Sequence, residues 1–349
     1  MSRRVLPFVF LTALILFAPV ETSARTQLES IENFLDDNHV GQDGFRNSSG
    51  EGVTVRATAD ALQIANVLSV KVNNTLDILY YYQRTQNPDG GFGNTPDLSS
   101  DLNTTVAAVR GLGYLPVNWS QLHNWEIFGY YNSSVSKLLF ENVSKTTGYI
   151  EGMSHLNFQR IALWLDYISV AFSLGYIPTM DSEVMIQELL TMQLSNGSYS
   201  SLKLAANVIL LLNLLGQEPN DADLAAKFIL AHVTEGGGFS YSGNGAGSLE
   251  ASYLGVSALD ALGKINSLEY KNALTKFVLS LQKSNSGFAQ SPSSLSTMHD
   301  TKLAILTLFM LKELDELQAP DVLQTIGFVD YPWLFAILPF VLLIRRRKL

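Results

Sequence analysis

The sequence of 349 residues contains no cysteine. This absence excludes disulfide bonds, zinc sites with thiolate ligands, iron–sulfur clusters and cysteine nucleophiles. Charged residues are also scarce, at 16%, and the formal net charge is -9. Because such a chain has few cations for phosphate contacts, we expect no nucleic-acid partner. Hydrophobic residues make up 47%, which is enough for a large folded core.

One long apolar run lies at the start of the chain. Arg3 and Arg4 precede this run, and the small residues Thr22-Ser23-Ala24 follow it. A positive start, an apolar stretch and small residues at its end are typical of a secretory signal peptide, which we assign to residues 1–24. The alternative is an uncleaved membrane anchor. In both cases the residues that follow are expected outside the cytoplasm.

A second long apolar run covers residues 326–344 and is interrupted by Asp330. Its length favours a transmembrane helix, and the basic tail of residues 345–349 is expected on the cytoplasmic side. The sequence therefore predicts a type I single-pass protein of the cell membrane, with residues 25–325 as the extracytoplasmic domain. A short apolar run with a basic end also resembles a sorting signal that is replaced by a lipid or wall anchor. The sequence leaves both outcomes open.

The domain between these ends is more acidic than the whole chain, because the ends hold six basic residues and two acidic ones. It also contains seven Asn-x-Ser/Thr sequons, which are compatible with glycosylation outside the cell. One of them, Asn103, falls near a predicted helix start, where we do not expect modification. The glycosylation candidates are Asn47, Asn73, Asn118, Asn132, Asn142 and Asn196.

An internal repeat organises residues 28–315. Each unit has an amphipathic helix, a glycine–aromatic turn and a second, more apolar helix. Because an apolar helix such as 205–212 has to be covered on several faces, we expect the second helices to form an inner ring and the first helices an outer ring. The glycines are expected to adopt backbone conformations that other residues resist, while the aromatic residues pack back onto the hairpins. The six turns are Gly44-Phe45, Gly91-Phe92, Gly148-Tyr149, Gly197-Ser198-Tyr199, Gly238-Phe239 and Gly287-Phe288.

These repeats resemble those of a known family. The clearest copy, Gln86-Asn87-Pro88-Asp89-Gly90-Gly91-Phe92-Gly93, and the helix start Glu250-Ala251-Ser252-Tyr253 are similar to repeats of protein prenyltransferase β subunits and squalene-type terpenoid cyclases. The resemblance implies an all-α fold, an (α/α)6 toroid of six helical hairpins around a central cavity. The predicted C-terminal transmembrane helix follows this toroid.

The resemblance also implies positions for a zinc site. Prenyltransferases of this family bind zinc with an aspartate, a cysteine two residues later and a histidine in the last repeat. Those positions fall on Glu250, Ser252 and Asp300, which supply neither the thiolate nor the imidazole. We therefore predict no metal and no cofactor, and expect zinc only if the chain is a divergent enzyme.

The remaining residues of the family's chemistry are largely replaced. The basic positions that hold the lipid diphosphate fall on Asn244 and Gly247, whereas the neighbouring tyrosine persists as Tyr253, a candidate for lining the ligand cavity. Squalene-type cyclases protonate their substrate with an Asp-x-Asp-Asp motif, and no such string occurs. The nearest string, Asp221-Ala222-Asp223, is interpreted as acids at a helix start.

Three carboxylates remain as catalytic candidates: Asp101, Glu250 and Asp300. All three lie near the predicted starts of inner helices, which converge at one end of a toroid. Carboxylates at such an end can serve as the acid and base of a glycosidase-like reaction. The alternative is that acids favour helix N-termini for structural reasons. The histidines do not form a metal-binding spacing and are interpreted as structural or solvated; they include His155, His232 and His299.

Three functions stay open at this point. The preferred one is a membrane-anchored cell-surface toroid that binds a ligand or partner without catalysis. The second is a prenyltransferase or terpenoid-cyclase-type enzyme with a divergent site. The third is a carbohydrate-active (α/α)6 enzyme. The expected partners are the membrane, through the C-terminal helix, and a surface protein, a glycan or an isoprenoid.

Overall fold

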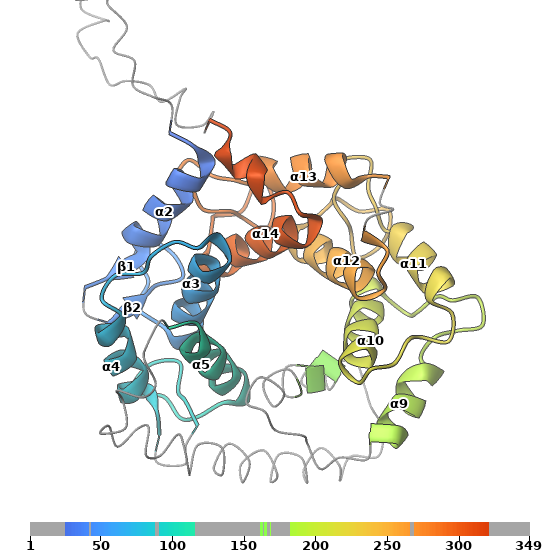
Figure 1. Ribbon diagram of the computed structural model, residues 1–349, viewed down its shortest axis with the longest axis horizontal. Helices are drawn as coiled ribbons and strands as arrows, with labels where there is room; N and C mark the ends of the chain where they lie inside the picture. The colour runs from blue at the N-terminus through green and yellow to red at the C-terminus, as the bar shows by residue number, and fades with distance from the viewer. Residues whose placement is uncertain are drawn as a thin grey trace, which may run out of the picture.

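The computed structural model describes residues 25–41, 43–87, 91–115, 161, 162, 164, 165, 168, 182–265 and 269–320. Their helices alternate along the chain between an outer and an inner layer of one ring (Figure 1). The outer helices are α2 (Gln27–Asn38), α4 (Thr75–Thr85), α9 (Ser182–Thr191), α11 (Ala222–Leu230) and α13 (Lys271–Ser280). The inner helices are α3 (Val55–Leu68), α5 (Leu102–Tyr114), α10 (Leu202–Leu214), α12 (Leu249–Ala261) and α14 (Met298–Leu311).

The inner helices share one kind of beginning. Each follows an N-cap side chain that accepts a hydrogen bond from a backbone N–H in the first turn, which satisfies a donor that the helix itself leaves unpaired. The N-caps are Thr54, Asp101, Ser201, Ser248 and Thr297. Five described residues between 161 and 168 lie between α5 and α10 in the ring, where the repeat predicts another inner helix (Figure 1).

The turn between an outer and an inner helix is also repeated. In the first hairpin, the strands β1 (His39–Val40) and β2 (Gly44–Phe45) pair antiparallel, with His39 opposite Phe45. The same spacing recurs in three later hairpins as single bridges. These bridges join Gln86 to Phe92, Val233 to Phe239 and Gln282 to Phe288. The predicted docking of the aromatic residues is confirmed, because all five described ones are at most 4% exposed.

A buried hydroxyl fixes each of four aromatic residues, and the sequence patterns did not reveal it. The hydroxyl belongs to a serine or threonine 13 residues after the aromatic, and it accepts a hydrogen bond from the aromatic residue's backbone N–H. The pairs are Phe45 with Thr58, Phe92 with Thr105, Phe239 with Ser252 and Phe288 with Thr301, at 2.9–3.0 Å. Buried backbone donors need such partners, so this contact holds the turn onto its inner helix.

The expectation about the turn glycines is wrong at most positions. Gly197 does adopt a positive φ of 79°, but Gly238 and Gly287 do not. At Gly287 a Cβ atom would instead overlap the ring of Phe34 on α2, and at Gly238 it would lie 2.5 Å from the ring of Phe277 on α13. Glycine is required there because the aromatic ring of an outer helix lies directly against the backbone.

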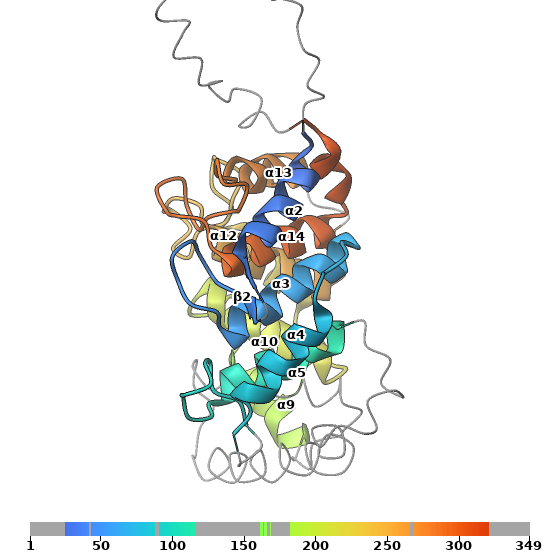
Figure 2. The same cartoon turned by 90° about the vertical axis from the view of Figure 1, so that its left-hand side faces the viewer.

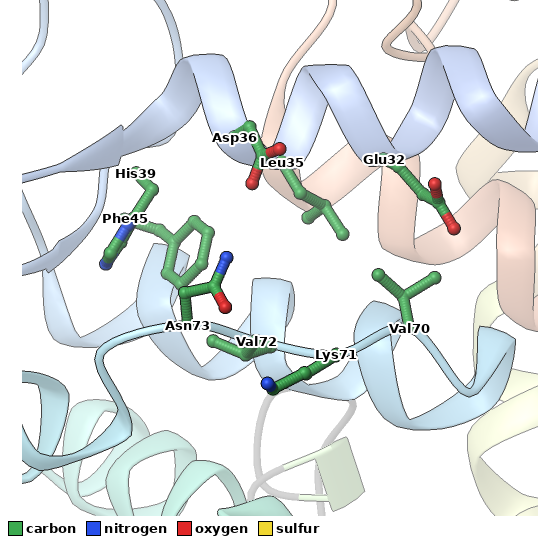
Figure 3. A pocket seen from close by; sticks show the side chains of 9 residues that line it. All are labelled: Glu32, Leu35, Asp36, His39, Phe45, Val70, Lys71, Val72 and Asn73. Carbon is green, nitrogen blue, oxygen red and sulfur yellow. The ribbon is translucent and has the colours of Figure 1, made fainter.

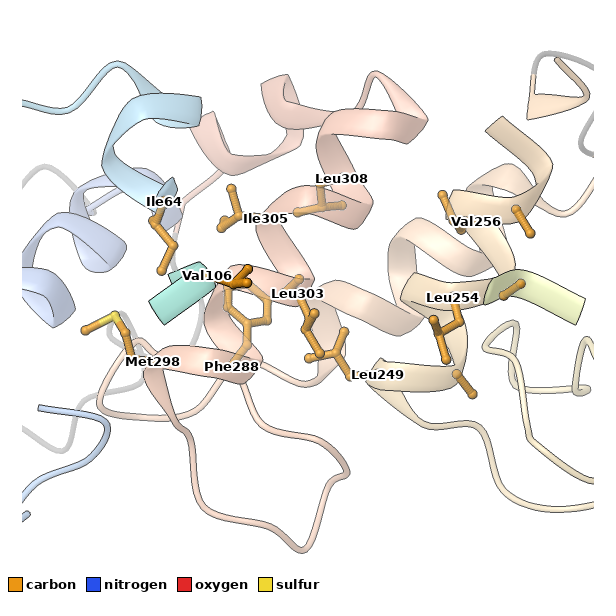
Figure 4. Close-up of a cluster of buried hydrophobic side chains, with 14 of the residues drawn as sticks. Ile64, Val106, Leu249, Leu254, Val256, Phe288, Met298, Leu303, Ile305 and Leu308 are labelled. Carbon is orange, nitrogen blue, oxygen red and sulfur yellow. The ribbon is translucent and has the colours of Figure 1, made fainter. Parts of the chain in front are cut away.

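The ring closes without a covalent link between its first and last hairpins. α14 packs against α3, and Ile64 of α3 lies beside Ile305 and Leu308 of α14 in the buried cluster of Figure 4. The 3₁₀ helix η4 (Leu314–Gln318) follows α14 and packs against α2. The backbone N–H of Gln27 donates to the carbonyl of Ala319 at 3.0 Å, so the two described ends of the chain lie side by side (Figure 2).

The inner and outer layers predicted from the repeat are confirmed, and the fold is an α/α toroid. None of the helices in the described ranges is both long and apolar enough to cross a membrane. The predicted signal peptide at 1–24, the transmembrane helix at 326–344 and the basic tail at 345–349 lie outside the described residues, as does the turn Gly148-Tyr149.

Candidate functional site

Charged side chains collect at the beginnings of the inner helices. The outer helices lie outside the inner ones, and α3, α12 and α14 each pack against an inner helix on two sides, so their remaining side faces the centre of the ring (Figure 1). The second residue of four inner helices has an ionisable side chain and is at least partly exposed. These residues are Arg56 on α3, Lys203 on α10, Glu250 on α12 and His299 on α14. We call the first two turns of the inner helices the amino-terminal rim.

Three ion pairs join neighbouring inner helices along this rim. Arg56 of α3 contacts Asp101, the N-cap of α5, at 2.9 Å, and Lys203 of α10 contacts Glu250 of α12 at 3.2 Å. Lys302 of α14 contacts Asp60 of α3 at 2.7 Å, which links the last inner helix to the first. The basic residues of these pairs are therefore each matched by a carboxylate on the adjacent helix.

The pair at the ring closure is the most buried of the three. The side chains of Asp60 and Lys302 are 14% and 10% exposed, and His299 adds a contact to Asp60 at 3.1 Å through Nδ1. Burial opposes the ionisation of Asp60, but the Lys302 ammonium and the His299 ring outweigh it and lower the pKa of this carboxyl. Asp60 is therefore held as a carboxylate between two cationic or hydrogen-bonding groups.

Glu250 and Asp300 lie near each other on the rim. Burial raises the pKa of the Asp300 carboxyl and the negative charge of Glu250 adds to this, while the Thr297 hydroxyl, the His299 ring and the Gln290 backbone partly offset both effects. Gln290 joins the two helix starts, because its side-chain oxygen also accepts from the backbone N–H of Glu250 at 3.1 Å. Tyr241 hydrogen-bonds to Glu250, and burial together with that carboxylate raises the pKa of its phenol.

Asp101, the third candidate, is not part of this pair. It caps α5 by accepting from the backbone N–H of Thr104 at 2.9 Å, and it holds Arg56 of α3. Partial burial opposes its ionisation, but the Thr104 and Arg56 interactions outweigh this and lower its pKa. The structure therefore places Asp101 at an inner-helix start, as predicted, and engages it in capping and ion pairing.

The positions equivalent to the family's zinc ligands do not fit a metal. The Ser252 hydroxyl is fully buried, accepts from the backbone N–H of Phe239 and donates to the carbonyl of Ser248. Glu250 is held by Lys203, and Asp300 accepts from the Thr297 hydroxyl at 2.8 Å. Within the described ranges, no three histidine, cysteine, aspartate or glutamate side chains are grouped so that they could hold a metal ion.

The positions equivalent to the diphosphate-binding residues fit that ligand no better. Asn244 is exposed and carries no charge. A Cβ atom on Gly247 would lie 3.1 Å from the ring of Phe277, so this position has little room for a longer side chain. Tyr253 lies on α12 and is partly buried against the core, and its role in lining a ligand cavity stays a prediction.

Several residues of the site were missed by sequence reasoning: Arg56, Asp60, Lys203 and Lys302 on the rim, and Tyr241 beside it. A signal existed for two of them, because Arg56 and Lys203 stand at the second position of predicted inner helices, as Glu250 does. Of the histidines, His299 was interpreted as structural or solvated and is bound to Asp60. His232 contacts the carbonyl of Phe228 at 2.9 Å, and His155 lies outside the described residues.

The fold and the rim define an α/α toroid whose inner helices begin with matched charges. A family model for the prenyltransferase alpha-alpha toroid domain matches residues 5–131 and 225–331, which is more than half of the chain. The chain belongs to this family. No curated protein was found to match it.

Solved structures agree with the fold. The protein geranylgeranyltransferase-I of Candida albicans, complexed with GGPP, is 13% identical with a TM-score of 0.56, and the match covers 78% of this chain and 90% of that one. The type II terpene cyclase MstE from Scytonema, without ligand, is 14% identical with a TM-score of 0.52, covering 83% of this chain and 97% of that one. A variant of MstE in complex with merosterolic acid A is 13% identical, with a TM-score of 0.52 and coverages of 83% and 96%. At such identity the likeness supports the fold alone.

Proposed function

We propose that this protein is a membrane-anchored toroid of the cell surface that binds an apolar ligand of the isoprenoid class without transforming it. The signal-like residues 1–24 and the apolar run at 326–344 support the location. The observation that carries the absence of catalysis is the set of ion pairs on the amino-terminal rim. The described cations of this rim are each matched by a carboxylate, so the described inner helices offer no cluster of unmatched positive charge there for a diphosphate.

The ligand class rests on the side of α14 that faces the centre of the ring. Leu306, Phe309 and Met310 recur at helical spacing on the part of α14 that its neighbours leave at least partly exposed. Phe309 is 54% exposed although it belongs to an inner helix. An exposed aromatic residue beside two partly exposed apolar ones is a suitable contact for an apolar chain. The geranylgeranyl compound named with the Candida albicans relative is a molecule of this class.

The test uses the purified full-length protein. Zinc content and transfer from a labelled prenyl diphosphate to a peptide ending in cysteine are measured together with binding of a fluorescent polyprenyl alcohol. We expect binding without transfer, and weaker binding in Phe309→Ser. The control Leu295→Ser removes a side chain that is 85% exposed on a loop and should bind normally. Stoichiometric zinc with transfer that is abolished by Glu250→Ala or Asp300→Ala would refute the proposal.

One observation favours a second candidate, an enzyme that uses carboxylates. Glu250 and Asp300 form a pair in which the pKa of Asp300 is raised, and such a carboxyl can hold a proton and donate it. This chemistry is common to the divergent terpenoid-cyclase and carbohydrate-active alternatives. The residues would act as an acid, Asp300, beside a carboxylate, Glu250.

The second candidate is tested by titration and by activity. In a carboxyl-selective NMR titration, Asp300 should titrate above the ordinary aspartate pKa, and Glu250→Gln should lower its pKa because a neighbouring negative charge is removed. If a polyprenyl or oligosaccharide substrate is converted and Asp300→Asn abolishes the conversion, the enzyme is favoured over the binding protein. Conversion that survives Asp300→Asn would exclude this carboxyl as the acid.

A further inference from the structure

The described sequons differ in how far the fold engages them. Asn47 is part of the ring closure: its side-chain oxygen accepts from the backbone N–H of His299 at 3.4 Å, and its carbonyl accepts from Met298 at 2.7 Å. The Asn103 sequon ends in Thr105. The hydroxyl of Thr105 donates to the backbone carbonyl of Asp101 and accepts from the backbone N–H of Phe92. Both sequons are therefore occupied by contacts that hold the toroid together.

Asn73 is in a different position. It lies in the connector, residues 69–74, which joins α3 to α4 and is bounded by Ser69 and Asn74 with positive φ angles of 56° and 55°. Its side chain is exposed, and among the described residues none makes a hydrogen bond with its amide. The sequon's third residue, Thr75, is the first residue of α4. This sequon is the one near the start of the chain that a glycosylating enzyme could reach without breaking a tertiary contact.

The side chain of Asn73 also points into a pocket. The pocket lies between α2 and the connector and has a volume of about 230 Å³ (Figure 3). Leu35, Phe45 and Val72 contribute apolar surface, while Glu32 and Asp36 contribute carboxylates from α2. Figure 3 shows the Asn73 amide on the connector directed toward α2, with Phe45 beside it.

The lining of this pocket suits a sugar ring. A pyranose has an apolar face that packs on aromatic and aliphatic side chains, and hydroxyls that donate to carboxylates. The pocket offers both kinds of contact within reach of one amide nitrogen, and its volume is of the order of a single sugar residue. A cationic ligand would also be attracted by Glu32 and Asp36, but the exposed Lys71 on the same pocket opposes it.

We propose that Asn73 carries an N-linked glycan whose first sugar lies in this pocket, against Phe45 and Leu35 and within reach of the Asp36 carboxylate. The inference rests on the proposed location outside the cytoplasm. The glycan would cover the connector and fasten it to α2. We expect Asn47 and Asn103 to remain unmodified, because Asn47 is held against the start of α14 and the Thr105 hydroxyl of the Asn103 sequon is already bonded within the fold.

The experiment uses the full chain isolated from its own cells. Glycopeptide mass spectrometry should find sugar on the peptide containing Asn73 and none on those containing Asn47 or Asn103. Thr75→Ser keeps the sequon and should keep the modification, whereas Thr75→Ala and Asn73→Gln should lose it. Hydrogen exchange at Lys71 and Val72 should then become faster in the two unmodified variants than in Thr75→Ser.

The mass spectrometry tests whether Asn73 is modified, and the hydrogen exchange tests whether the sugar lies in the pocket. An unmodified Asn73 overturns it, and sugar on Asn118, Asn132, Asn142 or Asn196 in that case leaves the extracytoplasmic location standing. Sugar on Asn73 with equal hydrogen exchange at Lys71 and Val72 in all variants overturns the placement in the pocket, because the glycan then extends into solvent. Sugar on Asn47 in the folded protein contradicts the comparison of sequons.

Discussion

Replacing Lys302 by methionine tests whether the rim ion pairs are equivalent or whether the ring closure depends on one of them. The substitution keeps most of the aliphatic stem and removes the ammonium group that contacts Asp60 at 2.7 Å. Lys203→Met is the matched control, because Lys203 also joins two inner helices, at 3.2 Å from Glu250. The two pairs differ mainly in burial.

The expected magnitudes follow from that difference. The side chains of Lys302 and Asp60 are 10% and 14% exposed, and removing one partner of a buried pair typically costs about 3–5 kcal/mol. His299 remains at 3.1 Å from Asp60, so we expect the lower end of this range. Lys203 and Glu250 are each 40% exposed, and pairs of that kind contribute at most about 1 kcal/mol.

The assay is urea unfolding of the full-length protein in detergent at neutral pH, followed by far-UV circular dichroism. Because the folded-state pKa of Asp60 is lowered, its contribution is present above the unfolded aspartate pKa of about 3.9 and is lost as the pH falls through the folded value. The deficit of Lys302→Met should therefore shrink in acid. Equal losses for Lys302→Met and Lys203→Met at neutral pH would refute the reasoning.

Two further predictions concern the repeated turns. Thr301→Val should lower the free energy of unfolding by about 1–3 kcal/mol in the same urea assay, because the buried N–H of Phe288 loses its acceptor. The control is Thr191→Val, since the Thr191 hydroxyl donates to an exposed carbonyl. This control should change the free energy of unfolding by less than about 0.5 kcal/mol. Similar losses in both variants would argue against the hydroxyl contact. Gly287→Ala should cost about 1–3 kcal/mol because its Cβ meets the Phe34 ring, and Phe34→Leu in the same chain should recover part of the loss. Gly113→Ala meets no atom within 4 Å and should be neutral or stabilising, so a loss there equal to that of Gly287→Ala would contradict the steric explanation.

The repeat made the fold predictable from the sequence. Each hairpin is built from nearby residues, and the glycine–aromatic turns mark where an outer helix ends and an inner helix begins. The apolar residues of 205–212 then specify which helix is inner, since a helix that is apolar on most sides has to be covered. For the same reason the sequence alone predicts Asp101, Glu250 and Asp300 at inner-helix starts.

Only the tertiary structure decided which groups meet on the rim. Asp60 and Lys302 are 242 residues apart, and nothing local in either helix selects the other as its partner. Ser252 was predictable as a replacement for a metal ligand, whereas its bond to the Phe239 N–H depends on how the turn folds back onto α12. Local propensities and hydrophobic periodicity act over a few turns of chain, but ion pairs between helices and the space around a glycine are set by ring closure, which brings distant repeats into contact.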